Sequence, residues 1–182
     1  YIIEENEIIP IPGKLLYRGI DISDIVDGFL KNDYFGFEET CYLLLFGNLP
    51  TPQELKDFEK LLAEYRNLPD DFVRDMILKM PSKDIMNSIA RSVLAFYSLD
   101  ESPENTSVEN VLRQCLMLIS VLPMMAVYGY HGYNHYVNDD SLYIHRPDPN
   151  CSMAENILRM LRPDNSYTEF QARVLDIALV LH

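Results

Sequence analysis

Apolar residues recur along most of the chain at spacings of three and four, as in helices with one buried face. The segment TPQELKDFEKLLAEYRNLP, which begins at Thr51, shows this pattern best. Thr51 suits the N-cap, Pro52 suits the first helical position, and Glu54 completes a capping box. The apolar residues of this helix form the stripe that we expect to be buried: Leu55, Phe58, Leu61, Leu62 and Tyr65.

Start and stop signals predict helices over most of the remaining chain. Asp21 and Asp24 can cap a short helix that reaches about Leu30. The segment Phe37–Phe46 has acidic residues in its first turn, and Gly47 follows it as a helix end should. Further helices are predicted at about 70–79, 83–97, 107–130, 152–161 and 168–182, with a kink at Pro123.

The last helix, EFQARVLDIALVLH, begins with a clear signal and ends without one. Ser166 and Glu169 have the spacing of a capping box, which predicts where the helix starts. No Gly, Asn or Pro follows to satisfy the last carbonyl groups, and the final residue is His182. The stripe that we expect this helix to bury consists of Phe170, Val174, Ile177, Ala178 and Leu181.

The first twenty residues follow a different pattern. Short β-branched or aromatic runs predict a small hairpin or ribbon, so the chain divides into a β segment at 1–20 and a helical part at 21–182. The residues that separate the runs are Glu5, Asn6, Pro10, Pro12 and Gly13. Within the helical part, the stretch 129–150 is rich in Tyr, Asn, Asp and Pro, which is typical of a long loop.

Composition is that of a globular domain, with 48% hydrophobic and 24% charged residues in 182. The net charge of −13 makes nucleic acid and anionic membrane surfaces poor partners. No apolar run is long enough to predict a membrane-spanning helix, and no signal peptide is visible. Cys41, Cys115 and Cys151 fit neither a disulfide framework nor a zinc pattern, so we expect reduced thiols in a cytoplasmic protein.

Histidines and arginines offer only weak candidates for chemistry. His131 and His135 are four residues apart and could bind a metal from one helical face, but Gly132 disfavours a helix and no third ligand is evident. We therefore expect exposed loop histidines and no metal site. Arg146 could bind a carboxylate or phosphate, or it could be held by a nearby aspartate, Asp148 or Asp140.

The predicted helices at 83–97 and 107–130 are apolar over a wide arc. The first of them carries Ile85, Ile89, Val93, Leu94 and Phe96. A helix that is apolar on more than one face must be buried on more than one side, and a partner subunit can provide the second cover. Residue chemistry alone therefore predicts an acidic, helical, oligomeric domain and does not reach a function.

Several segments, taken in order, give the chain a family resemblance. KLLYRGIDISDIV, FEETCYLLLFGNLPTPQELKDFEKLLAEYRNLP, MPSKDIMNSIARSVLAF and ARVLDIALVLH together resemble the citrate synthase family at family-like distances. The resemblance covers essentially the whole chain. It implies the N-terminal portion of a multihelical, mainly α large domain.

The resemblance also implies a reaction. Members of the family condense acetyl-CoA with oxaloacetate to give citrate and CoA, through an enol formed by an aspartate and a histidine, without a metal or cofactor. Methylcitrate synthases in the same family use propionyl-CoA, and this part of the sequence does not separate the two. A freestanding helical interaction module without catalytic activity is the rival interpretation.

The resemblance places the last residue near the active site. In the family, the ALVLH helix end leads into a segment H-x-x-H-G-x-N, whose second histidine is catalytic. His182 matches the first, so we expect it to bind substrate near the active-site entrance. No catalytic residue of the family falls within this sequence, which predicts an inactive N-terminal fragment. Glu155 stands where some members carry a substrate-binding histidine, and Arg18 lies in the YRG motif; neither receives a role.

The helices at 83–97 and 107–130 resemble the dimer-interface helices of the family. This agrees with their apolar composition, which was the independent reason to expect a second cover. The sequence thus predicts a two-fold homodimer through these helices, with small-molecule substrates as its other partners.

Overall fold

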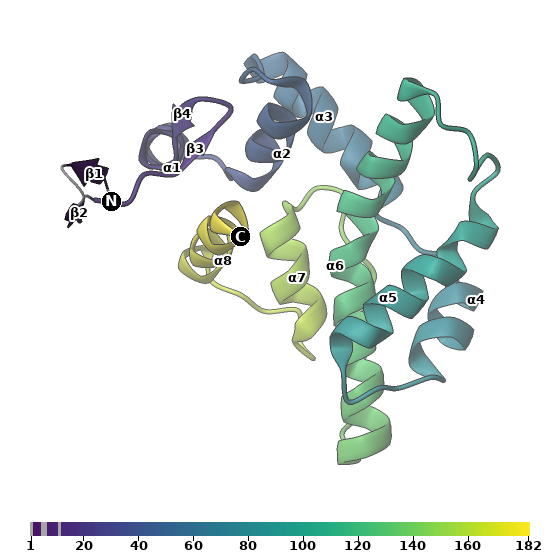
Figure 1. Ribbon diagram of the computed structural model, residues 1–182. Coiled ribbons are helices and arrows are strands. Elements are labelled where there is room, and N and C mark those ends of the chain that lie inside the picture. The colour runs from purple at the N-terminus through teal and green to yellow at the C-terminus, as the bar shows by residue number, and fades with distance from the viewer. Residues whose placement is uncertain (1, 5–6, 11) are drawn as a thin grey trace.

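The structure is a computed structural model that describes residues 2–4, 7–10 and 12–182. Helices make up most of the described chain, and short strands occur at its start (Figure 1). This arrangement confirms the expected mainly α fold with a short β segment at the start. The division of the chain into parts at 1–20 and 21–182 stays a prediction.

The described residues contain two antiparallel hairpins ahead of the helices. β1 (Ile2–Glu4) pairs with β2 (Glu7–Ile9), and β3 (Leu16–Tyr17) pairs with β4 (Ile20–Asp21). Arg18 and Gly19, between β3 and β4, have φ of 50° and 89°, the left-handed backbone that two-residue hairpin turns favour. The predicted hairpin is therefore confirmed; parts of that segment, at residues 1, 5, 6 and 11, lie outside the described residues.

The first helices begin and end where the sequence signals predict. They are α1 (Ile22–Lys31), α2 (Phe37–Phe46) and α3 (Pro52–Tyr65). Asp21 caps α1 by accepting a hydrogen bond from the Ser23 N–H at 3.0 Å, and Gly47 ends α2 with φ of 87°. Thr51 and Glu54 form the predicted capping box of α3, with bonds of 2.7 and 3.3 Å.

The later elements are also mostly helical. They are α4 (Asp70–Phe72), the π-helical turn η1 (Val73–Leu78), α5 (Ile85–Phe96), the 3₁₀ turn η2 (Tyr97–Leu99), α6 (Val108–Asn138), α7 (Met153–Leu161) and α8 (Glu169–Leu181). The helix predicted at 70–79 is thus a short α-helix that widens into a π-helical turn. The helices predicted at 83–97 and 152–161 are confirmed to within a few residues.

Helix α6 is longer than the sequence predicts. It continues through Pro123 and Gly132 and ends at Asn138, where Asp139 takes a left-handed conformation with φ of 57°. The prediction of a loop from residue 129 is therefore wrong for residues 129–138. Packing explains the difference, because a Cβ on Gly132 would lie only 3.4 Å from the Leu78 backbone. A glycine there lets η1 approach α6 closely, and this burial offsets its low helix propensity of roughly 1 kcal/mol.

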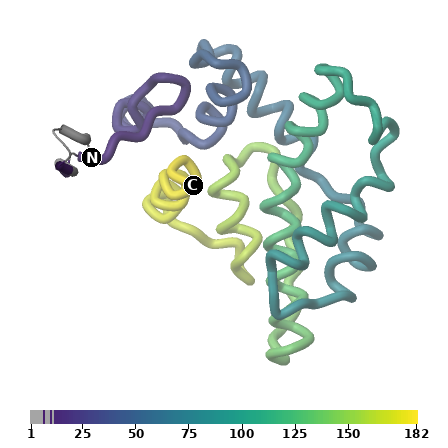
Figure 2. The backbone as a smooth tube through the Cα atoms, viewed as in Figure 1, coloured from purple at the N-terminus to yellow at the C-terminus, as the bar shows by residue number. Residues whose placement is uncertain are grey.

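The core is organised around α6. Its largest cluster joins α6 to η1, α5 and α7, and a smaller one joins it to α3. A third cluster brings the two ends of the chain together, with Ile25 and Phe29 of α1, Leu43 of α2 and Val180 of α8. The chain path shows α8 returning to the first helices (Figure 2). The last helix is thus held by the first part of the sequence.

By length and composition alone, α6 is long and apolar enough to cross a membrane. This corrects the expectation that no apolar run is long enough to predict such a helix. The core helix of a soluble protein meets the same criterion, and α6 contributes to two of the three core clusters.

Candidate functional site

The candidate site is the C-terminal end of α8, where His182 lies exposed beyond the last helical residue. The helix begins at Glu169, close to the predicted start, but its cap lies two residues later than predicted. Thr168 and Gln171 form its capping box, with bonds of 3.1 and 3.3 Å. The predicted Ser166 and Glu169 box is wrong, because Ser166 instead donates to the Asp164 carboxylate through its N–H and hydroxyl groups.

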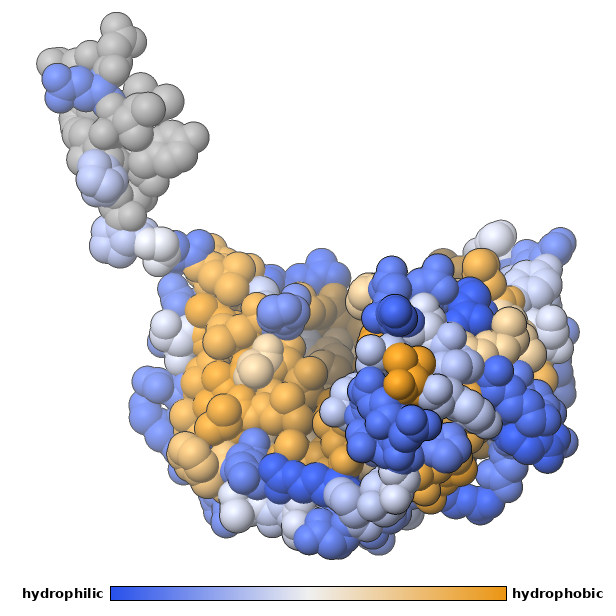
Figure 3. Space-filling view, turned by 90° about the horizontal axis from the view of Figure 1, so that it is seen from below, coloured by the Kyte–Doolittle hydropathy of each residue, from blue (hydrophilic) through white to orange (hydrophobic). Residues whose placement is uncertain are grey.

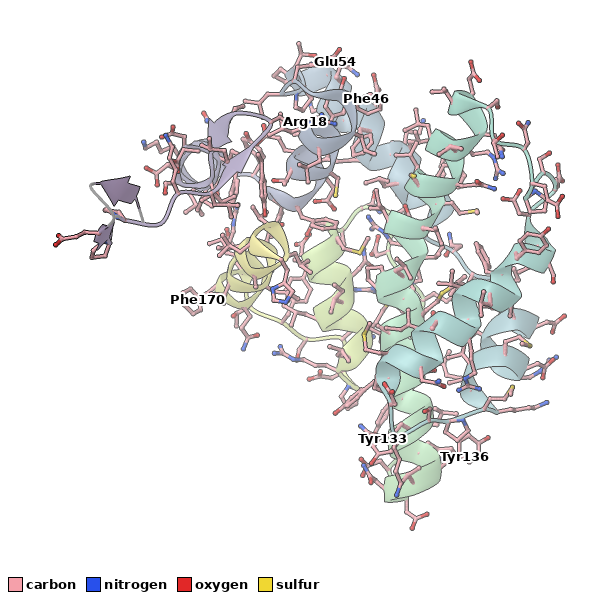
Figure 4. The ribbon with its side chains drawn as sticks, in the orientation of Figure 1. Arg18, Phe46, Glu54, Tyr133, Tyr136 and Phe170 are labelled. Atoms are coloured by element: carbon pink, nitrogen blue, oxygen red, sulfur yellow. The ribbon has the colours of Figure 1, made fainter. Side chains whose placement is uncertain are left out.

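The face of α8 that meets the core is only in part the predicted one, since Ile177 of the predicted stripe packs against the core but most of the stripe does not. Phe170 is 75% exposed, and Val174 and Leu181 are each 51% exposed. Phe170 points away from the other helices (Figure 4), and a space-filling view shows broad apolar surface on one side of the molecule (Figure 3). The helix buries a second face, made of residues four apart: Ala172, Asp176 and Val180. Periodicity identifies an apolar stripe but not which side of the helix will be covered.

The buried carboxylate of Asp176 binds the start of α2. Its two oxygens accept hydrogen bonds from the N–H groups of Gly36, at 2.7 Å, and Phe37, at 3.1 Å. Gly36 has no side chain with which to cap the helix, so α8 provides the acceptors that the first N–H groups of α2 need. Burial raises the pKa of Asp176 above its ordinary value, while these hydrogen bonds and Arg173 act in the opposite direction.

Arg173, one turn before Asp176, binds the residues that precede α2. Its guanidinium donates to the Tyr34 carbonyl oxygen and to the Asp33 carboxylate. It also lies over the Phe35 ring, with 4.6 Å between Cζ and the ring centroid. Arg173 and Asp176 therefore hold the segment 33–37 from one side of α8.

The last turn of α8 is bound by the β3–β4 hairpin. The Tyr17 hydroxyl donates to the Val180 carbonyl oxygen at 2.9 Å. Arg18 donates from Nε and a terminal nitrogen to the Leu44 carbonyl oxygen near the end of α2, at 3.1 and 2.6 Å (Figure 4). A positive charge such as that of Arg18 is stabilising near the C-terminal end of a helix. Through Tyr17 and Arg18, the YRG motif thus attaches the hairpin to α8 and α2. Arg18 thus has structural contacts in this chain.

The histidines at 131 and 135 lie on α6 and not in a loop. His131 is buried, and its Nε2 lies 2.8 Å from the Met160 carbonyl oxygen, so the expectation of an exposed loop residue is wrong for it. His135 is half-buried, with Nδ1 2.9 Å from the Asp140 carbonyl oxygen. Among residues 2–4, 7–10 and 12–182, no group of three His, Cys, Asp or Glu side chains is placed to hold a metal ion.

The other charged candidates take part in structural contacts. Arg146 donates to the Asp70 carboxylate at 2.6 Å. Its aspartate partner is therefore Asp70, and not Asp148 or Asp140 as considered from the sequence. Glu155 closes the capping box of α7 with Ser152 and accepts a hydrogen bond from the Tyr167 hydroxyl at 3.0 Å. Both side chains are thus engaged within the chain.

A buried ion pair between α2 and α3 was not found from the sequence. Glu38 and Arg66 are each 2% exposed, with 3.9 Å between the carboxylate and a guanidinium nitrogen. Glu38 also accepts from the Met153 N–H at 2.8 Å, and Arg66 donates to the Cys151 carbonyl oxygen at 2.8 Å. Glu38 Oε2 and Arg66 Nε have no partner within the described chain. The pair joins α2 and α3 to the start of α7.

Burial makes the Glu38 carboxyl group a weaker acid than an exposed glutamic acid. It raises the pKa of this carboxyl group from 4.5 to about 7, against the opposing effects of the Met153 N–H and Arg66. Desolvation also lowers the pKa of Arg66. A cavity of about 260 Å³ lies beside the pair, lined in part by Phe35, Glu59 and Asn150. The acidic first turn of α2 was the only sequence signal here, and it predicted a helix start and not a buried charge.

Comparison with known proteins gives consistent matches. The family model described as "Citrate synthase, C-terminal domain" matches residues 2–182. The chain is 30% identical to a citrate synthase of Corynebacterium glutamicum over 93% of its length and 37% of that protein. It is 33% identical to a citrate synthase of Haloferax volcanii, over 93% of this chain and 42% of that protein. A 2-methylcitrate synthase of Corynebacterium glutamicum is 27% identical over 86% of this chain and 38% of that protein.

Solved structures agree with the sequence matches. The crystal structure of citrate synthase from Pyrobaculum aerophilum is similar with a TM-score of 0.77 and 25% identity, over 93% of this chain and 41% of that one. A ternary complex of Thermoplasma acidophilum citrate synthase with carboxymethyl coenzyme A and oxaloacetate has a TM-score of 0.73 at 21% identity. The match covers 90% of this chain and 39% of that one. The latter supports the fold alone. The chain spans about two fifths of the length of these relatives.

Proposed function

This chain belongs to the citrate synthase family, and from that premise we propose that it forms part of an enzyme that condenses acetyl-CoA with oxaloacetate to give citrate and CoA. The observation that supports the proposal most strongly is the family match over residues 2–182. The citrate synthases of similar sequence and fold support the same assignment. The enzyme is thus an acyltransferase, and acetyl-CoA and oxaloacetate are substrates of a reaction that uses no metal or cofactor.

Within this enzyme, residues 1–182 provide the helical scaffold and the approach to the active site. Condensation requires a base for the methyl proton of acetyl-CoA and a hydrogen-bond donor for the thioester oxygen as the enol forms. The resemblance assigns these roles to a histidine and an aspartate that are not in this sequence. His182 is the residue of this chain that we assign to substrate binding. Residues 1–182 by themselves therefore release no thiol.

A 2-methylcitrate synthase is the second candidate. Two such enzymes of Corynebacterium glutamicum are 27% and 26% identical to the chain, close to the values for several citrate synthases. The reaction would follow the same route with propionyl-CoA in place of acetyl-CoA. A non-catalytic helical module is the remaining alternative, and it predicts no thiol release from any form of the protein.

We also propose that two copies associate through α5 and α6. The support is exposed apolar surface on these helices: Met86 is 71% exposed, Leu94 is 76% and Val108 is 81%. Apolar side chains left this open are typical of an interaction surface. The three cysteines are free thiols, which fits our proposal of a cytoplasmic protein.

The test combines intact mass, the downstream reading frame and a thiol-release assay. A reading frame that continues past codon 182 and completes the motif that His182 begins, with x-x-H-G-x-N, supports the enzyme. The longer protein should then release thiol from acetyl-CoA with oxaloacetate. Comparison with propionyl-CoA separates the two synthases. In that longer protein, His182→Ala should raise KM for substrate. A stop codon directly after His182 would favour the interaction module, and turnover by residues 1–182 alone would refute their assigned inactivity.

A further inference from the structure

Helix α8 is held by polar contacts as well as by apolar packing. Phe170, Val174 and Leu181 of its apolar stripe are at least half exposed. The buried face offers Ala172 and Val180 as fully covered apolar residues, and the half-buried Ile177 and Leu179 pack against neighbouring core clusters. Apolar packing of this kind is not directional, whereas hydrogen bonds are. The hydrogen bonds and charges along the buried face can therefore define the direction of the helix.

Two side chains of α8, one turn apart, hold one short segment. Arg173 binds the backbone or side chains of residues 33–35, and Asp176 accepts from the backbone N–H groups of Gly36 and Phe37. Asp176 is completely buried, and it lies 139 or 140 residues away in sequence from the groups it binds. The contact is bidentate and directional, because two oxygens meet two adjacent N–H groups.

A buried carboxylate is a costly way to hold two helices together. Burial raises the pKa of Asp176, which shows that desolvation outweighs the favourable effects of the helix start and Arg173. Buried charges add little to stability compared with well-packed apolar residues, but they can specify one arrangement.

We propose that Asp176, supported by Arg173, is a positioning residue that fixes the direction of α8 and thereby the location of His182. This inference rests on the proposed function, since substrate binding at His182 is what gives the location its importance. His182 follows Asp176 by six positions, which is about 9 Å along a helix at 1.5 Å per residue. A tilt of about 15° at Asp176 would move the helix end by roughly 2 Å. Displacements of about 1 Å in an active site can cost on the order of 100-fold in rate.

The experiment measures the position of the helix end directly, in the 182-residue chain. Cys41, Cys115 and Cys151 are replaced by Ser, and spin labels are attached at His182→Cys and Glu64→Cys, an exposed site on α3. Pulsed electron paramagnetic resonance then reports the distribution of distances between the labels. Because this measurement needs no turnover, a failure to find thiol release would contradict the proposed function without deciding this inference.

Two substitutions at Asp176 and one control separate positioning from general destabilisation. Asp176→Ala removes both acceptors and should broaden or shift the distance distribution by about 2 Å or more. Asp176→Asn keeps one acceptor oxygen and should restore part of the narrow distribution. Phe72→Ala removes the ring that packs edge-on against Phe96 of α5, which destabilises the core without touching the Asp176 contacts, and should leave the distribution unchanged.

The outcomes decide the proposal. If Asp176→Ala keeps the wild-type distribution, or if Phe72→Ala broadens it equally, Asp176 has no special part in directing α8. If Asp176→Ala does not fold, Asp176→Asn and Arg173→Gln provide the comparison. Each removes part of the contact, so each should broaden the distance distribution relative to wild type. Wild-type distributions in both of these variants would overturn the proposal.

Discussion

Glu38→Gln tests whether the buried carboxyl group between α2 and α3 makes the stability of the fold depend on pH. In the folded chain, burial raises the pKa of Glu38 from 4.5 to about 7. The folded state thus holds this proton more tightly than the unfolded state does. The stabilisation is fully present below about pH 4.5 and is lost as the pH rises through about 7.

The size of this effect follows from the same two values. The interval from 4.5 to about 7 corresponds to about 3 kcal/mol, since each pKa unit is worth roughly 1.4 kcal/mol. Burial also raises the pKa of Glu39, Glu59 and Asp176, so these groups act in the same direction as Glu38. Carboxyl groups whose pKa is lowered, such as Asp100, change the stability only at lower pH.

The assay is urea unfolding followed by far-ultraviolet circular dichroism, from about pH 4 to about pH 8. Wild-type protein should lose free energy of unfolding across this range, and Glu38→Gln should lose about 3 kcal/mol less. The comparison uses the change with pH and not the absolute stability, because the substitution also leaves the buried Arg66 charge without its partner. Glu64→Gln, at an exposed position of the same helix pair, is the matched control. Equal pH dependence in wild type and Glu38→Gln would refute the reasoning.

Other substitutions test the local packing, all by urea unfolding. Asn156 is buried, donates to three carbonyl oxygens of the segment 148–152 and accepts from the Asp148 N–H. Asn156→Ala should therefore lower the free energy of unfolding by about 2–4 kcal/mol. A loss below about 1 kcal/mol would contradict this role. Gly36→Ala should lower the free energy of unfolding by about 1–3 kcal/mol, because the added Cβ would lie 2.1 Å from the Phe29 ring. Gly28→Ala, whose Cβ would have nothing within 4 Å, should raise it by about 0.5–1 kcal/mol. Equal effects of the two substitutions would contradict the steric argument. Thr51→Ala should cost about 1 kcal/mol through loss of the α3 cap, and no change would show that the cap is dispensable.

The elements with strong local signals could be predicted from the sequence, while those fixed by packing could not. The capping box of Thr51 and the Gly47 stop depend on residues within a few positions of each other, so both were predicted correctly. The end of α6 was missed because the cost of Gly132 is offset by contact with Leu78, which lies far away in the sequence. The same limit explains the missed pair of Glu38 and Arg66.

The sequence by itself determined the family, the mainly α class and most of the helix boundaries, since these are recorded in residue order and local spacing. Only the tertiary structure decided which face of α8 is covered, and it placed Asp176 against α2 while most of the apolar stripe stayed exposed. The reason is physical. Periodicity describes one helix alone, whereas burial depends on the acceptors, donors and shapes that distant segments offer, such as the uncapped N–H groups of Gly36 and Phe37.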